Sequence, residues 1–550
     1  MLNSRRDFCK SFMALLPATK ALGAVSGYAG VGVPSPAEGA LKVADADLDA
    51  LIEKNRKGDF TLKSGGYEQM SRLLIGWAEI DTTPNGKVDL SGQYYHRVSK
   101  GIHSRLSATV LALESADKEQ VVMVSLDLVG FESTFQEQLR SMLRTVLPDL
   151  DVSKVILNVI HTHSAPGTDV TKGIGWLAEL PDVMPASEYR KFLLERIKSA
   201  VVEAWRNRKP GGIASALSSA RVGHCRRAAY ASGSAEMYGL TNREDFVGME
   251  GGEDSGVDLL FSFDESRKPT GVILNLACPS QVMEATYSIS SDFMGETRRL
   301  LKQRFGESFR TLGQISAAGC QSPRDLTRNY RGEPDFWHED GVTESGRRLF
   351  VAVESAFPHA AANIDDSPVM RHHGEIITLP RRRASYQAYF EAKKQLNQLE
   401  AAMPEDEAFR DFCKQVERNE KIPGRPGPYD SKLHHFVLMQ NNKAAVARYH
   451  DQDTHPSFEM ELHAIRLGNV VFVTNPFELF LDFGHQIKAR SAAEQTFIVQ
   501  LCGGTGGYLP SARAEQHGGY GGLIINGQVG SEGGKLLVDT TVKTIAELWS

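Results

Sequence analysis

Short runs of apolar and β-branched residues recur along the chain, and they predict buried strands. The clearest run covers residues 154–160 and ends at His161-Thr-His163-Ser, before an Ala-Pro-Gly turn at 165–167. The two histidines are two positions apart, so on an extended chain their side chains point to the same side. Imidazoles at the exit of a strand suit a zinc ion or proton transfer near neutral pH, although two surface histidines on a polar loop would show the same pattern.

Two stretches have the apolar period of a helix instead. Residues 134–148 begin with Thr134 and Glu137 in the spacing of a capping box and end at Pro148. Their apolar stripe consists of Phe135, Leu139, Met142, Leu143 and Val146. A second helix is predicted at about 187–207. We interpret both stripes as surfaces that face the core, not as cofactor sites.

The last third of the chain repeats this alternation. A strand at 469–474 leads to Glu478, a helix follows, and a strand at 496–501 leads to Tyr508. The same order of strand, helix and strand leads to His161, and both an internal repeat and the common architecture of α/β proteins would explain it. We predict one large α/β domain with mixed sheets, in which two sheets are layered and flanked by helices.

Composition and charge narrow the function classes. The 550 residues are 41% hydrophobic and 24% charged with a net charge of −6, which is an ordinary balance for a globular protein. There is no basic excess that would indicate a nucleic-acid partner, and no apolar run of about 18 residues that would indicate a transmembrane segment. The predicted domain covers residues 73–550, with a charged helical insertion at about 384–421 and a lead-in segment at 31–72.

Residues 1–30 resemble a twin-arginine export signal. Arg5 and Arg6 are followed by Phe8 and Lys10 in the expected places, and then by a modest apolar segment. A mildly basic disordered tail is the alternative interpretation. The signal predicts a periplasmic or secreted protein.

The cysteines do not indicate a disulfide framework. Six are present and none is in a CxxC pair. Cys9 lies in the predicted signal, and the remaining five leave an odd thiol. One cysteine is therefore available for another role.

Several short motifs cover the chain, in order, from about residue 73 to its end. They are Ile80-Asp-Thr-Thr-Pro84, VSLD at 124–127, HTHSAPG at 161–167, SSDFMG at 290–295, SAAGCQSPR at 316–324, NPFE at 475–478 and GGYLP at 506–510. Together they resemble the neutral ceramidase family. The resemblance implies a zinc-dependent hydrolase that cleaves an N-acyl amide bond in a small-molecule or lipid-like substrate. Because the chain ends soon after Gly533-Gly534, we expect the catalytic domain alone, without the family's C-terminal β-sandwich.

The resemblance also implies a zinc site. Its ligands would be His161, Glu478 and Tyr508, together with Cys278 at a position where the family has histidine. Thiolate is itself a strong zinc ligand, so a His/Cys/Glu/Tyr site is chemically reasonable. Two alternatives stay open: Cys278 is an inert buried thiol in a site that has lost its metal, or the nearby Glu284 substitutes as a ligand.

The same mapping implies three catalytic residues. His163, beside the metal, would shuttle a proton or bind a developing oxyanion. Ser322 would act as a nucleophile or as an orienting hydroxyl. An arginine at position 226 or 227 would bind an anionic or hydroxylated group of the substrate, and we assign this role to Arg226.

Each of these residues also has a purely structural explanation. Taken singly, Glu478 is explained as a charge at a helix N-terminus, Ser322 as a turn residue and Tyr508 as a core residue. Two functional alternatives follow. One is a catalytically silent relative that binds a ligand, and the other is a metal hydrolase that acts on an ester or on a sugar N-acyl group.

Overall fold

The structure is a computed structural model that describes residues 73–93, 97–168, 182–328, 337–420 and 433–550. The predicted export signal, the lead-in segment at 31–72 and a Pro/Gly-rich connector at 422–429 lie outside the described residues.

The largest sheet has eight strands and mixed pairing. In spatial order they are β14 (Arg310–Ile315), β12 (Pro269–Leu276), β11 (Gly256–Asp264), β6 (Lys209–Ser219), β1 (Leu74–Asp81), β3 (Ser107–Glu114), β4 (Gln120–Leu126) and β5 (Val155–Val159). The outer pairs β12–β14 and β4–β5 are parallel, and the pairs between them are antiparallel. Alternate side chains of these strands therefore face two different apolar cores.

A second sheet of four strands lies against the first. Its order is β16 (Met370–Pro380), β17 (Ser457–Leu467), β18 (Val470–Thr474) and β20 (Gln495–Val499), with β18 and β20 parallel. One apolar cluster joins the facing sides of the two sheets. It includes Leu111, Met123, Ile156 and Ile273 from the first sheet and Ile465, Phe472 and Phe497 from the second.

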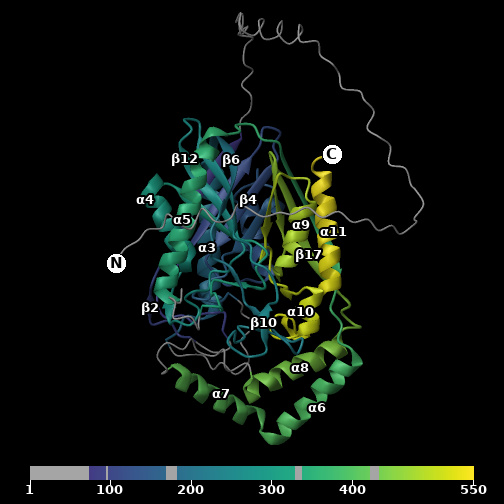
Figure 1. Cartoon of the computed structure of the whole chain (residues 1–550). Coiled ribbons are helices and arrows are strands. Elements are labelled where there is room, and N and C mark those ends of the chain that lie inside the picture. Colours follow the sequence, from purple (N-terminus) through teal and green to yellow (C-terminus); the bar gives the residue numbers. More distant parts are fainter. Residues whose placement is uncertain (1–72, 94–96, 169–181, 329–336, 421–432) are drawn as a thin grey trace, which may run out of the picture. The chain divides into compact units, whose positions relative to one another are not determined.

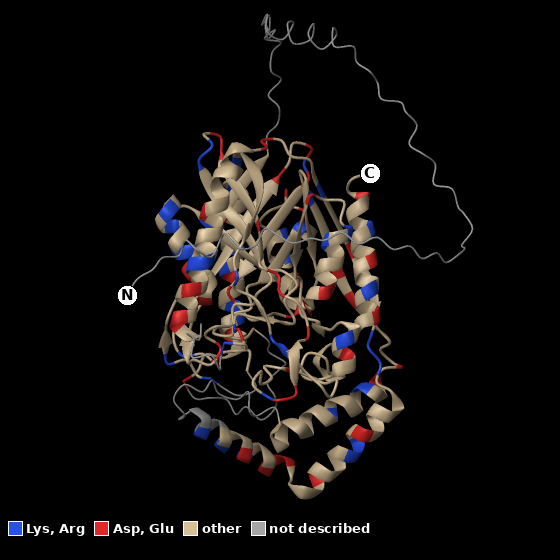
Figure 2. Ribbon diagram, viewed as in Figure 1, with Lys and Arg blue, Asp and Glu red and all other residues tan. Residues whose placement is uncertain are grey.

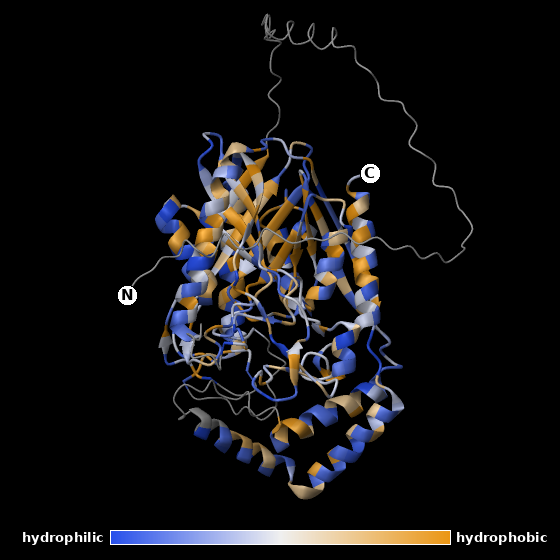
Figure 3. Cartoon of the chain, viewed as in Figure 1, coloured by the Kyte–Doolittle hydropathy of each residue, from blue (hydrophilic) through white to orange (hydrophobic). Residues whose placement is uncertain are grey.

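Helices cover the outer face of each sheet (Figure 1). The first sheet is covered by α2 (Ser133–Arg144), α3 (Ala186–Arg206), α4 (Asp292–Phe305) and α5 (His338–Ala362). The second sheet is covered by α9 (Leu481–Arg490) and α11 (Ser531–Glu547). The order helix, sheet, sheet, helix confirms the predicted α/β domain with two layered sheets and flanking helices. Figure 3 shows the strands as the most hydrophobic part of the body, as expected for sheets that are buried on both faces.

The predicted strands and helices match the structure closely, with one correction. The strand before His161 is β5, and the predicted helix at 187–207 is α3. The capping box is wrong: α2 begins at Ser133, its N-cap is Glu132, and no side chain caps it. Thr134 lies inside the first turn, so its hydroxyl cannot serve the N-terminal amides as predicted.

Helices outside the body form an arm with its own small core. They are α6 (Tyr386–Ala402), α7 (Glu405–Glu420) and α8 (His435–Asp451), and apolar contacts among Leu396, Phe412, Phe436 and Met439 hold them together. The first two occupy the stretch predicted as a helical insertion, whereas α8 was not predicted. Charged residues of both signs line α6 and α7 (Figure 2). Among the described helices, none combines the length and the hydropathy that a membrane span needs.

Short strand pairs complete the described part of the chain, and two of these pairs carry Ser322, Glu478 and Tyr508, which are discussed next. They are β2 (Gly101–Ile102) with β13 (Ser288–Ile289), β7 (His224–Cys225) with β15 (Gln321–Ser322), β19 (Phe477–Leu479) with β21 (Gly507–Leu509), and β8 (Arg227–Tyr230) between β9 (Ala235–Met237) and β10 (Phe246–Met249). The remaining short helices are η1 (Val152–Lys154), α10 (Ala512–His517) and η3 (Ile524–Asn526).

Candidate active site

The predicted site residues lie on connections that follow strands of both sheets. His161 comes directly after β5, Glu478 after β18 and Tyr508 after β20. Because the strands of a parallel pair end at the same edge of a sheet, the segments after β18 and β20 meet there. They form the parallel pair β19–β21, in which Glu478 lies directly opposite Tyr508.

His161 presents one ring nitrogen to this pair. Its backbone has a positive φ of 60°, a left-handed conformation that non-glycine residues rarely adopt outside functional or strained sites. Nδ1 donates a hydrogen bond to the Val129 carbonyl oxygen at 2.6 Å, so Nε2 carries the lone pair. Nε2 lies 3.8 Å from Glu478 Oε2. Burial lowers the pKa of His161, although the charge of Glu478 opposes this, and the neutral imidazole is a metal-ligating form.

Arg226, and not Arg227, lies at this pair. One terminal nitrogen of its guanidinium donates to the Tyr508 hydroxyl at 3.2 Å and lies 3.6 Å from Glu478 Oε2. The other donates to the Tyr238 hydroxyl at 3.2 Å and to Gln281 Oε1 at 3.1 Å. Burial lowers the pKa of Arg226, but the two tyrosines and Glu478 raise it well above its usual range, so the cation is permanent.

Arg227 serves a different part of the molecule. It forms a buried ion pair with Glu250 and donates to the carbonyl oxygens of Gly518 and Tyr520. It therefore ties β8 to the glycine-rich segment after α10. The sequence offered both arginines, and the contacts of the two side chains distinguish them.

His163 lies beside His161 on the same connection. The two Nε2 atoms are 3.2 Å apart, and the rings meet edge to face. Burial lowers the pKa of His163 well below its usual range, and the neighbouring cations Arg97 and Arg226 add to this effect. His163 is therefore a neutral imidazole at pH 7, which can accept a proton.

Ser322 is buried on β15, at the edge of the same group of residues. Its hydroxyl accepts a hydrogen bond from the Tyr238 hydroxyl at 3.3 Å and one from the Arg324 amide at 3.1 Å. Burial raises the pKa of Tyr238 to about 12, so this phenol is a donor and not a base. No described histidine is hydrogen-bonded to Ser322, and these contacts favour an orienting hydroxyl over an activated nucleophile.

Cys278 lies in an apolar environment. It belongs to the core that includes Leu276, Val282 and Phe293, and its thiol lies 3.6 Å from the Pro279 carbonyl oxygen. Burial and the charge of Asp292 raise the pKa of the thiol well above its usual range. None of the hydrogen bonds or ion pairs in the described part of the chain joins Cys278 to the other predicted ligands, and its role as a ligand stays a prediction.

Three residues of the site were not predicted in their observed roles. Tyr238 and Gln281 both contact Arg226, and Glu284 lies 3.5 Å from His163 Nδ1. Only Glu284 had a signal in the sequence: its position near Cys278 suggested a substitute ligand. Gln281 and Glu284 follow β12 and Tyr238 follows β9, and no local pattern indicates that these segments turn toward the site.

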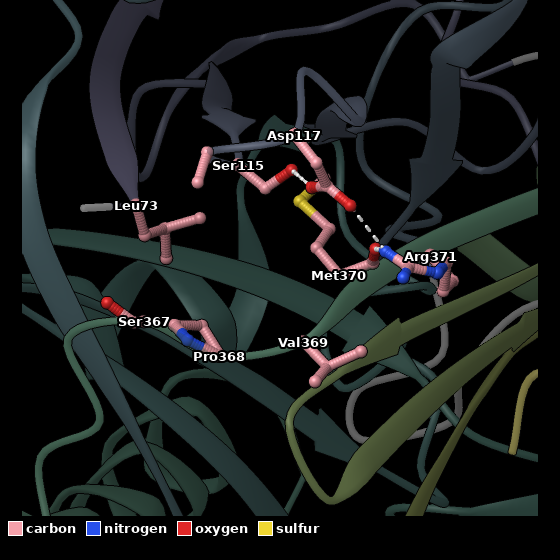
Figure 4. A pocket seen from close by; sticks show the side chains of 9 residues that line it. Leu73, Ser115, Asp117, Ser367, Pro368, Val369, Met370 and Arg371 are labelled. Carbon is pink, nitrogen blue, oxygen red and sulfur yellow. Dashed lines mark hydrogen bonds and ion pairs between the residues drawn. The ribbon is translucent and has the colours of Figure 1, made fainter. Parts of the chain in front are cut away.

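A hollow of about 190 Å³ lies elsewhere and shares no residue with this group (Figure 4). It is lined by Leu73, Ser115, Ala116, Asp117, Ser367, Pro368, Val369, Met370 and Arg371. Its main polar feature is the ion pair between Asp117 and Arg371 at 2.7 Å, in which both side chains are more than half exposed. Such a pair is solvated and offers no orphaned donor or acceptor to a ligand.

Comparison with solved structures identifies the fold. The structure of neutral ceramidase from Pseudomonas aeruginosa matches with a TM-score of 0.60 and 17% sequence identity, over 87% of this chain and 75% of that chain. A ceramidase structure described as complexed with C2 matches over the same shares, with a TM-score of 0.60 and 15% identity. No family model and no curated protein sequence matches. The chain therefore has a neutral ceramidase-like fold, as the ordered motifs predicted.

The fold family implies a zinc ion, and the side chains of His161, Glu478 and Tyr508 offer donor atoms for it. His161 Nε2, which carries the lone pair, lies 3.8 Å from Glu478 Oε2, and Tyr508 lies directly opposite Glu478 in the backbone register of β19 and β21. Nitrogen and oxygen donors of this kind fit zinc. In the described part of the chain, no three His, Cys, Asp or Glu side chains converge as a metal-binding group, so a zinc ion here would need the Tyr508 oxygen as well.

Proposed function

We propose that this protein is an exported zinc-dependent hydrolase that cleaves an N-acyl amide bond in a lipid-like substrate. One observation carries the proposal: His161, Glu478 and Tyr508, which follow three different strands, come together against the buried cation of Arg226. The neutral ceramidase-like fold supports it. His161, Glu478 and Tyr508 would hold the metal, and Cys278 is the predicted fourth ligand.

The residues of the chain supply the remaining chemistry. Zinc, when bound, polarises the amide carbonyl and lowers the pKa of water. His163, neutral at pH 7, accepts the proton of the attacking water and returns it to the leaving amine. Arg226 Nε is a buried donor without a partner among the described residues, and it donates to an oxygen of the substrate. Ser322 orients the substrate from the far side of Tyr238.

Export is the part of the proposal that rests on the sequence alone. The twin-arginine pattern at residues 1–30 supports delivery to the periplasm or the medium. This route carries folded proteins, which suits a metal site that is loaded before export. Replacing Arg5 and Arg6 with lysine is expected to leave the protein in the cytoplasm, as measured by fractionation and immunoblotting.

The hydrolase is tested by metal analysis together with a substrate panel. The purified protein is expected to carry stoichiometric zinc and to hydrolyse N-acyl amides of the ceramide type in preference to esters and N-acyl sugars. Glu478→Gln should lose both properties, because it removes the negatively charged carboxylate ligand that lies next to His161. The matched control is Glu461→Gln, a carboxylate outside the site that should keep both. A wild-type protein without zinc, or a Glu478→Gln variant that hydrolyses normally, would contradict the proposal.

A catalytically silent, ligand-binding relative is the second candidate. The apolar environment of Cys278 favours it, because a buried neutral thiol is a poor metal ligand. This candidate predicts no hydrolysis on any panel, and thermal stabilisation by an N-acyl ligand instead. Activity that appears only in Cys278→His would decide for it.

A further inference from the structure

We propose that Tyr238 is a positioning residue that keeps the hydroxyl of Ser322 as a hydrogen-bond donor toward an oxygen of the substrate. Tyr238 does so by donating its own proton to Ser322 Oγ, so that the serine can make one further hydrogen bond only as a donor. The effect on hydrolysis rests on the proposed function, whereas the direction of the Tyr238–Ser322 hydrogen bond does not.

Ser322 Oγ already accepts two hydrogen bonds. The Tyr238 hydroxyl lies 3.3 Å from it, and the Arg324 amide nitrogen lies 3.1 Å from it. A serine hydroxyl has two acceptor positions and one proton, so both acceptor positions are occupied. Ser322 is fully buried, and none of the described residues accepts its proton. A buried donor without an acceptor is costly, and it persists where a ligand uses it.

The direction of the bond between the two hydroxyls follows from Arg226. One terminal nitrogen of this guanidinium lies 3.2 Å from the Tyr238 hydroxyl oxygen. A guanidinium only donates hydrogen bonds, so the phenol oxygen is the acceptor in that contact. A phenol is a stronger acid than an alkyl hydroxyl, and a cation on its oxygen strengthens its own donation. Tyr238 is therefore the donor to Ser322.

The backbone holds the phenol in this place. Tyr238 follows β9 with a positive φ of 57°, which is uncommon for a large side chain. Its amide donates to the Arg226 carbonyl oxygen at 2.7 Å. Backbone conformations of this kind persist where the surrounding structure holds them, and they cluster at functional sites. Burial raises the pKa of Tyr238 to about 12, so the phenol keeps the proton that it donates.

Arg226 does not depend on Tyr238 alone. The nitrogen that contacts the phenol also donates to Gln281 Oε1 at 3.1 Å, and the other terminal nitrogen donates to Tyr508. Removing the phenol oxygen therefore leaves the guanidinium paired, but it vacates one acceptor position of Ser322. The serine hydroxyl can then rotate and accept a hydrogen bond where it previously donated one. The loss caused by Tyr238→Phe should thus pass through Ser322.

Infrared spectroscopy measures the direction of the bond and needs neither substrate nor zinc. The C–O stretching frequency of a phenol differs between a phenol that donates and accepts and one that only accepts. Subtracting the spectrum of the matching Tyr238→Phe protein isolates the band of Tyr238. Wild type should show a phenol that does both, and Ser322→Ala should shift the band to a phenol that only accepts, because the missing oxygen leaves less room than a water needs. An unshifted band overturns the proposal.

A double-mutant cycle measures the effect on hydrolysis. Ser322→Ala should lower kcat/KM by about 10-fold and Tyr238→Phe by about 3-fold, as expected for one hydrogen bond, and the double variant should match Ser322→Ala. Losses that multiply in the double variant overturn the proposal, because Tyr238 would then act without Ser322. The matched control is Tyr230→Phe on β8, a buried phenol that donates to the Leu240 carbonyl oxygen and should keep wild-type kinetics.

The two measurements also separate this proposal from the proposed function. A wild-type protein that binds no zinc and hydrolyses nothing contradicts the proposed function alone, since the infrared band still decides which hydroxyl donates. If Tyr238→Phe does not fold, the difference spectrum between wild type and Ser322→Ala shows the same band.

Discussion

Two buried clusters in this molecule contain the same residue types but differ in how completely they are paired. In each, two imidazoles meet at about the same separation: 3.2 Å for His161 and His163, and 3.1 Å for His372 and His463. Each also contains glutamate and arginine. A glycine lies under one histidine of each cluster: a Cβ at Gly92 would lie 2.6 Å from His163, and one at Gly374 would lie 2.8 Å from His463.

In the second cluster, the buried polar side-chain atoms are all hydrogen-bonded. His372 Nδ1 donates to the Gln120 carbonyl oxygen, and His463 is hydrogen-bonded to Glu461 at 3.1 Å. Arg140 donates to both oxygens of Glu461, at 2.7 and 3.0 Å. No buried side-chain nitrogen or oxygen of these four residues lacks a partner in the described structure. The histidines lie within the regular strands β16 and β17, and the cluster joins the two sheets through α2.

The first cluster leaves atoms unused. His163 Nδ1, Glu284 Oε1 and Arg226 Nε are buried and have no hydrogen-bond partner in the described structure. They lie on connections after strands, and His161 has a left-handed backbone conformation. Unsatisfied buried polar groups are costly and persist where a ligand or a reaction uses them. The same residue types therefore serve two purposes. Where their buried polar atoms lack hydrogen-bond partners, as around His163, they can bind a ligand; where all of them are hydrogen-bonded, as around His463, they connect parts of the fold.

The largest expected effect concerns the satisfied cluster. Arg140→Met should lower the free energy of unfolding by about 3 kcal/mol, because it leaves the Glu461 carboxylate without its cation. This lies at the low end of the usual range, since Glu461 is about a quarter exposed. Urea unfolding measures the loss. The catalytic constants of the folded protein should be unchanged. A selective loss of kcat would show that the cluster around His463 takes part in catalysis and is not purely structural.

Removing a histidine should affect activity in the first cluster and stability in the second. His161→Ala is expected to reduce hydrolysis by about 100-fold or more and to release zinc, because losing a group that only supports a ligand already costs about 10 to 100-fold. His463→Ala, the matched change in the satisfied cluster, should leave both properties intact and lower stability instead. Equal losses of activity in the two variants would show that the clusters do not differ in function.

The pH dependence of stability should have opposite signs at the two glutamates. Burial would raise the pKa of Glu461, but hydrogen bonds from His463 and Arg140 lower it from 4.5 to about 2. Its stabilising contribution is therefore present above pH 4.5 and is lost as the pH falls toward 2. Burial raises the pKa of Glu284 from 4.5 to about 7, so this residue destabilises the fold progressively as the pH rises from 4.5 to 7.

Chemical unfolding of wild type, Glu461→Gln and Glu284→Gln at several pH values measures both effects. Between pH 5 and 6, the stability of Glu284→Gln relative to wild type should increase by up to about 1.4 kcal/mol. Over the same interval the stability of Glu461→Gln relative to wild type should stay constant, and the variant should approach wild type only below pH 4.5. Parallel curves for the two variants would mean that the two carboxyls share one environment.

The sequence predicted the parts of the site that lie next to regular structure. The apolar run at 154–160 located β5 and so placed His161 and His163 at a strand exit. The order of the motifs singled out Glu478 and Tyr508, and the structure adds that the parallel pair β19–β21 puts these two residues opposite each other. These positions follow from period and motif order, which are local properties.

Residues that reach the site by long-range packing could not be predicted in the same way. Tyr238 and Glu284 approach Arg226 and His163 only because the segments after β9 and β12 turn inward, and the cluster of His372 and His463 depends on the pairing of β16 with β17 across the insertion. No period in the sequence encodes such contacts. The capping box failed because α2 begins earlier than the motif requires: its N-cap is Glu132, two residues before Thr134.

The smallest effect is expected at an ion pair that is exposed to solvent. Asp117 and Arg371 form an ion pair at 2.7 Å, as short as the Arg140–Glu461 contact, but their side chains are 57% and 51% exposed. Solvent screens such a pair, so Asp117→Ala should change the free energy of unfolding by less than about 1 kcal/mol. High salt should reduce the difference further. A loss of unfolding free energy as large as that of Arg140→Met would show that burial does not explain the difference between the two ion pairs. The stability contributed by the Arg140–Glu461 pair would then have to come from its hydrogen-bond geometry.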